Sequence, residues 1–136
     1  MLCTRWNNKS AFSTTADKTT QFMTKTTTSV TSHSASATSP ISVEFLRDLV
    51  DSNEDCDDLT NVILNSLQKK SSKHKFLIQS TVIVAPDALD RDLNISTNFG
   101  AIWDSENDGY ITIKLDRDDG SEINSTLLTV YWIYTN

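Results

Sequence analysis

The chain has 136 residues, of which 38% are hydrophobic and 22% are charged, and its formal net charge is −6. This is the length of one domain, and the composition is that of a globular protein. No run of about 18 apolar residues occurs, so the sequence predicts no transmembrane helix and no membrane insertion. The start, Met1–Trp6, lacks the apolar stretch of a secretory signal, and we expect a cytoplasmic protein.

Charge and cysteine usage narrow the possible partners and compartments. Residues 1–40 hold four basic residues and one acidic residue, whereas residues 41–136 hold eight basic and seventeen acidic residues. Because such an acidic body repels phosphate backbones, we expect no nucleic-acid binding by residues 41–136. The two cysteines, Cys3 and Cys56, are too few for a disulfide framework, and both are expected to be reduced thiols.

Residues 1–38 are interpreted as a disordered tail, and residues 39–136 as the folded domain. Serine or threonine fills 18 of the first 40 positions, and Thr24–Thr38 has almost no large apolar side chain. Such a segment cannot bury enough apolar surface to offset the entropy lost on ordering. The alternative is a mitochondrial transit peptide, because the segment is weakly basic and poor in acidic residues, although it has one arginine and no helical stripe.

Two amphipathic helices are expected next. Ser39-Pro40 is typical of a helix start, with serine as the N-cap and proline at the first helical position. Apolar residues then recur at helical spacing in two runs, Ile41, Phe45, Leu46, Leu49, Val50 and Leu59, Val62, Ile63, Leu67. The second run follows an acidic cluster at residues 54–58 and ends near Lys69 and Lys70, an arrangement that suits the helix dipole.

From Lys75 onward a period of two predicts four strands. They are Phe76–Ala85, Thr97–Asp104, Tyr110–Arg117 and Ile123–Tyr134, separated by an irregular segment and by turns at 105–109 and 119–120. Helices followed by a run of strands favour an α+β fold, with two N-terminal helices packed on a four-stranded antiparallel sheet.

The first and last of these strands are apolar on both faces, which is typical of strands in the middle of a covered sheet. Because two short helices can cover one face only, the second face needs another cover. A second copy of the chain is the simplest one, so we expect a homodimer.

The sequence shows no catalytic pattern. His33 falls in the predicted tail, and His74, between two lysines, is expected to be a solvated surface residue. Phosphate-binding loops, nucleophile elbows and metal-spaced Cys/His sets are missing from the sequence. The calcium-like run Asp104–Gly109 has Leu115 where a calcium loop needs glutamate, so it is interpreted as a hairpin turn. We therefore expect a non-enzymatic protein with no catalytic residue, no metal and no cofactor.

The order of the elements resembles that of the Tctex-type dynein light chains, with a long connection after the first strand. The resemblance is carried by Phe76–Ala85, Phe99–Gly109 and Leu127–Ile133, and it spans about residues 40–136. The hairpin with Trp103-Asp104 and Asp108-Gly109 is its most family-specific part. Gly100-Ala101 before it, with Trp132-Ile133 at the end, is similar to a fungal branch named "topoisomerase I damage affected", a name that implies no topoisomerase chemistry.

The resemblance implies a homodimer in which each protomer lends one strand to its neighbour's sheet, and in which an extended peptide of a larger partner adds to the sheet edge. The lent strand would be Thr97–Asp104, which has no proline or lysine to block its edge. The residues of the peptide groove and dimer strand would be Asn98, Phe99, Gly100, Ile102 and Trp103. The fungal branch implies a cytoskeletal partner at the cortical actin and endocytic patches. The alternative is a true dynein light chain that binds a motor intermediate chain.

Overall fold

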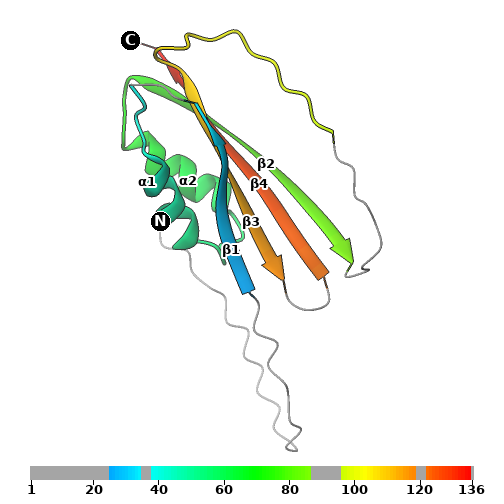
Figure 1. Cartoon of the computed structure of the whole chain (residues 1–136). Coiled ribbons are helices and arrows are strands. Elements are labelled where there is room, and N and C mark those ends of the chain that lie inside the picture. Colours follow the sequence, from blue (N-terminus) through cyan, green and yellow to red (C-terminus); the bar gives the residue numbers. More distant parts are fainter. Residues whose placement is uncertain (1–24, 35–37, 87–95, 119–121, 136) are drawn as a thin grey trace, which may run out of the picture.

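The structure is a computed structural model that describes residues 25–34, 38–86, 96–118 and 122–135. These residues form β1 (Lys25–His33), α1 (Val43–Asp51), α2 (Leu59–Gln68), β2 (His74–Pro86), β3 (Gly109–Asp118) and β4 (Glu122–Tyr134). The strands make one antiparallel sheet in the order β1-β3-β4-β2, and both helices lie on the same face of it (Figure 1). The predicted α+β architecture, two helices on a four-stranded antiparallel sheet, is confirmed.

The fourth strand of the sheet is not the one that the sequence predicted. Lys25–His33, within the predicted tail, forms β1 and pairs with β3, whereas Thr97–Asp104 lies outside the sheet. The tail interpretation was therefore wrong over Lys25–His33. Thr26, Thr28 and Val30 are β-branched residues at every second position, which favours a strand although the segment is poor in apolar residues. The first 24 residues, on which the transit-peptide alternative depends, lie outside the described residues.

The helix ends are set by polar side chains at other positions than predicted. Ser42, not Ser39, is the N-cap of α1, because its hydroxyl accepts a hydrogen bond from Phe45 N at 3.1 Å. Asp58 caps α2 by accepting from Asn61 N at 3.3 Å, and the acidic cluster at 54–57 precedes the helix.

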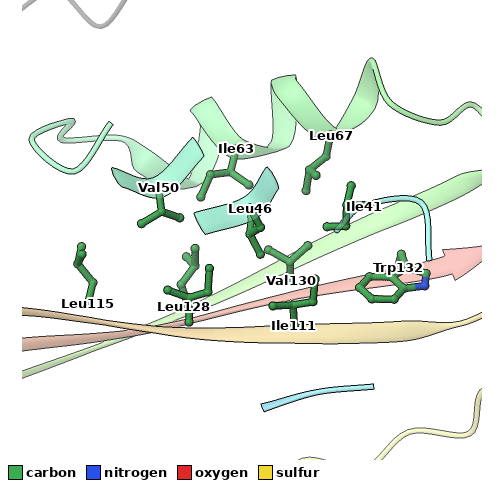
Figure 2. Packing of buried hydrophobic residues seen from close by; sticks show 11 residues of the cluster. Ile41, Leu46, Val50, Ile63, Leu67, Ile111, Leu115, Leu128, Val130 and Trp132 are labelled. Atoms are coloured by element: carbon green, nitrogen blue, oxygen red, sulfur yellow. The ribbon is translucent and has the colours of Figure 1, made fainter. Parts of the chain in front are cut away.

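The hydrophobic core lies between the helices and the facing side of the sheet (Figure 2). Its buried side chains are Ile41, Leu46 and Val50, Ile63 and Leu67, Ile111, Ile113 and Leu115, and Leu128, Val130 and Trp132. The strand members occupy alternate positions, as expected for one face of a pleated sheet. The helices do not reach the far end of β2, where Val82 and Val84 on the same face are 61% and 53% exposed.

Two further observations concern covalent state and membrane crossing. Cys56 is disulfide-bonded, so the expectation of a reduced thiol is wrong for this residue, and Cys3 lies outside the described residues. Neither described helix is long and apolar enough to cross a membrane.

Candidate functional site

The segment predicted to be the second strand is an extended stretch without sheet pairing, here called the arm (residues 96–104) (Figure 1). All of its residues are exposed, and the side chain of Ile102 is fully so. The apolar surface of Ile102 therefore stays in water within the single chain.

Two aromatic side chains of the arm lie on the sheet face that is turned away from the helices, here called the open face. The ring of Phe99 stacks on that of Tyr131 with 4.8 Å between centroids, and Trp103 stacks on Tyr110 at 5.7 Å. Tyr110 and Tyr131 are themselves paired in the register of β3 and β4. The arm is thus attached to the open face at two points, with Ile102 left outside.

Between the arm and the open face lies a mostly apolar pocket of about 230 Å³. Its apolar walls include Leu77, Phe99, Ile102, Trp103, Tyr131 and Ile133. Four of these side chains, Leu77, Phe99, Ile102 and Ile133, are at least 40% exposed, so the pocket offers apolar surface to an incoming side chain.

The rest of the open face mixes polar side chains with the apolar Leu127 and Ile83. The hydroxyls of Thr112 and Thr129 lie 3.0 Å apart, and Lys114 Nζ is 2.9 Å from Asp116 Oδ2. Burial alone would raise the pKa of Asp116, but hydrogen bonds from Ser125 and Lys114, with the charge of Lys114, lower it instead. The second face is therefore most apolar at the end where the arm lies, and Leu127 and Ile83 add apolar side chains further along it.

The hairpin that joins the arm to β3 is fixed by Asp108, a buried carboxylate. Its Oδ2 accepts a hydrogen bond from Asp104 N at 2.9 Å, and its Oδ1 accepts one from Tyr134 N at 2.7 Å. Asp104 in turn accepts from Asn107 Nδ2 at 2.6 Å and Glu106 N at 3.0 Å, and these bonds lower its pKa, Asn107 contributing most. The carboxylates of Asp104 and Asp108 thus accept hydrogen bonds from N–H groups, and the run is a polar turn; it joins β3 to the unpaired arm, so the predicted hairpin of two paired strands is not formed within the chain.

His74 is not the solvated surface residue that its lysine neighbours suggested. The ring is half-buried, with Nδ1 2.8 Å from Ser71 Oγ, and Nε2 is buried without a partner among the described residues. Burial lowers the pKa of His74, Asp108 raises it and Lys73 lowers it. The imidazole lies edge-on to Tyr134 at 5.4 Å, which makes it a packing residue at the start of β2.

The two outer edges of the described sheet are β1 and β2. The sequence placed Phe76–Ala85 in the middle of the sheet, which is wrong, because β2 pairs with β4 alone. An apolar edge strand with an unpaired row of backbone groups is a template for another strand. Side chains on both faces of β2 are exposed, Leu77 on one and Val82 and Val84 on the other.

The predicted groove residues all lie on the arm, but they do not act alike. All five are exposed, but Phe99 and Trp103 also stack on Tyr131 and Tyr110. Sequence reasoning missed the two tyrosines and the edge position of β2. The tyrosines could have been found, because they fall at open-face positions in the alternation of Tyr110–Arg117 and Ile123–Tyr134.

Comparison with known proteins places the chain in a family. The sequence matches the Tctex-1 family over residues 48–133, which covers both the hairpin and the arm. It is 34% identical over 102 residues to "Topoisomerase I damage affected protein 2" of Clavispora lusitaniae, a match that spans 72% of this chain and 88% of the relative. The proteins of the same name from Candida glabrata and Lachancea thermotolerans are 31% and 29% identical, over 72% and 76% of this chain and 90% and 94% of theirs. The resemblance drawn from the hairpin and the strand order is therefore confirmed, and the chain belongs to the Tctex-1 family.

Proposed function

We propose that this chain is a non-enzymatic, homodimeric adaptor that binds an extended peptide of a larger cytoskeletal protein by β-strand addition. The proposal rests on two elements of the same chain that each lack a neighbouring strand. One is β2, an apolar strand whose outer edge is open, and the other is the arm, an extended segment outside the sheet. Membership in the Tctex-1 family supports a light-chain-like binding module.

Strand exchange satisfies both elements at once. The arm of one protomer adds to the outer edge of β2 in its partner, where Ile102 leaves water and the exposed apolar side chains of β2 are covered. The connection between β2 and the arm, residues 87–95, can reach about 30 Å when extended, enough to cross to a second subunit. In this arrangement the dimer has a continuous sheet on each side.

The peptide then adds to the outer side of the exchanged arm. Backbone hydrogen bonds supply affinity, and side-chain pockets along the groove select the sequence. An added Cβ at Gly100 would meet no atom within 4 Å in the single chain, which leaves room for a second backbone. Asn98, Gly100 and Ile102 are the groove residues, and Phe99 and Trp103 hold the arm in place.

The cellular setting is proposed from the relatives. The setting proposed is that of a cytoplasmic adaptor of the cortical actin and endocytic cytoskeleton, which the resemblance to the fungal branch of proteins named for topoisomerase I damage implies. The name describes those proteins and assigns no nucleic-acid chemistry to this one.

Affinity capture with mass spectrometry tests the function. The full-length wild-type chain is compared with Ile102→Asp and with Asn65→Asp, which adds the same charge at an exposed position of α2. We expect regulators of cortical actin to be captured by wild type and Asn65→Asp and lost with Ile102→Asp. Motor intermediate chains in their place would identify a true dynein light chain, and partners unaffected by Ile102→Asp would contradict the proposed site.

A further inference from the structure

The strand β1 lies outside the part of the chain that matches the Tctex-1 family, which begins at residue 48. It pairs with the outer edge of β3, at the side of the sheet opposite β2 (Figure 1). Without β1, β3 would be an edge strand with an unpaired row of backbone groups. We propose that this edge of β3 is a second strand-addition site, which β1 caps within the same chain and which a partner's extended peptide occupies by displacing β1.

The sequence of β1 shows which peptide the edge accepts. Val30 lies opposite Ile113, and Thr28 lies opposite Leu115, so these two positions face the core side, where Val30 packs on the buried cluster. Ser29 lies opposite Lys114, on the open face. The ligand is therefore an antiparallel strand with β-branched residues two positions apart and a small polar residue between them.

Ser34, the residue directly after β1, makes the last hydrogen bonds between this segment and β3. Ser34 N donates to Tyr110 O at 2.9 Å, and Tyr110 N donates to Ser34 Oγ at 2.9 Å. Ser34 lies so close to Gly109 that a Cβ on the glycine would overlap with the serine hydroxyl. A ligand that replaces β1 thus carries a serine four residues after its valine, the spacing of Val30 and Ser34.

The contacts of β1 are few enough for displacement. Of its nine side chains only Thr26, Thr28 and Val30 are half-buried, and the other six are exposed. Val30 is the single aliphatic side chain among them. The register with β3 also shifts between Val30 and Ser32, which interrupts the ladder toward the C-terminal end of β1. By contrast, β4 is paired on both sides and contributes three buried core residues.

The first test is hydrogen exchange on the unmodified full-length chain. Amides of residues 25–33 should exchange much faster than those of β4, because β1 opens without global unfolding. Exchange as slow as that of β4 would overturn the proposal. Protection of 25–33 that rises with protein concentration would also overturn it, since β1 of a second copy would then fill the edge.

The second test uses a fluorescent peptide with the sequence of residues 25–34 as the probe. Full-length Val30→Asp should release β1, because a carboxylate cannot stay against Ile113 and the core. Ser29→Asp is the matched control, since it places the same charge on the other face, opposite Lys114.

Val30→Asp should bind the probe about tenfold or more tightly than wild type or Ser29→Asp, because the edge is no longer capped. Bound probe should slow amide hydrogen exchange in residues 109–118 and not in the arm. This result distinguishes the proposed site on β3 from the strand exchange of the arm under the proposed function. Equal affinities in three folded proteins would overturn the proposal. If Val30→Asp does not fold, the hydrogen-exchange measurement on the unmodified chain tests the proposal by itself.

Discussion

At the entrance to β3, the backbone of Gly109 lies directly against the indole of Trp132, its partner in the register of β3 and β4. A Cβ at this position would lie 2.7 Å from Trp132 Cε2 and would overlap with Cζ2 as well. The glycine is needed here for close approach, since Trp132 is locked in the core and cannot move aside.

Gly109→Ala should therefore destabilise the fold. Overpacking of this kind costs about 1–3 kcal/mol, measured as a lower free energy of unfolding in urea. Gly100→Ala is the matched control, because its Cβ meets no atom within 4 Å, and its effect should stay within about 0.5 kcal/mol. Equal effects of the two substitutions would show that the packing around Gly109 is not as described.

A pH dependence is expected at His74. Burial lowers the pKa of its ring in the folded state below the unfolded value of 6.5, with Asp108 opposing this shift and Lys73 adding to it. The unfolded chain therefore binds more protons between the two pKa values, and the stability that the neutral ring provides is lost as the pH falls through that window.

The urea midpoint of the wild-type chain should fall between about pH 7 and about pH 5, and it should fall less in His74→Gln, which cannot be protonated. The comparison isolates His74, because the acidic residues are the same in both proteins. An identical decrease in the two proteins would mean that His74 is not involved.

At the scale of elements, β1 shows how far a polar segment can belong to a sheet. Three of its residues carry the alternation that pairs it with β3, and one of them, Val30, reaches the core. Val30→Ala should lower the free energy of unfolding by about 1 kcal/mol, as expected for a half-buried valine. Ser29→Ala, on the exposed side of the same strand, should change it by less than about 0.5 kcal/mol. Equal, negligible effects would indicate that β1 does not contribute to the folded state.

The elements that could be predicted are those with a strong sequence pattern. The two helices, β2, β3 and β4 combine apolar periodicity with turn or cap residues, and each was found within a few residues. The strand β1 was missed because composition dominated the interpretation of a Ser/Thr-rich segment, although its alternation was present. Thr97–Asp104 has strand-like residues but no partner strand in its own sheet, which sequence alone cannot show.

The candidate site was predicted in the same uneven way. Phe99 and Trp103 were expected to anchor the exchanged strand, which stays a prediction; within the single chain they stack on Tyr131 and Tyr110. The edge position of β2 could not be predicted, because strand order depends on long-range pairing that leaves no local signal.

At the scale of the whole molecule, the single chain leaves apolar surface exposed at two places that strand exchange would join. These are the outer edge of β2, with Leu77, Val82 and Val84, and the arm, with Ile102. On β2, Leu77 lies on the face away from the helices, and the helices do not reach Val82 and Val84; the arm lies outside the sheet. In the proposed dimer, a second copy that contributes its arm would cover both.

Light scattering on the full-length chain at low micromolar concentration tests this account most directly. Wild type and the charge-matched control Asn65→Asp should have twice the chain mass of 15.2 kDa. Ile102→Asp should shift toward 15.2 kDa while its circular dichroism stays unchanged, because the side chain is fully exposed within one chain. A wild-type protein that remains at 15.2 kDa at every concentration measured would contradict the exchange of arms, and with it the proposed binding site.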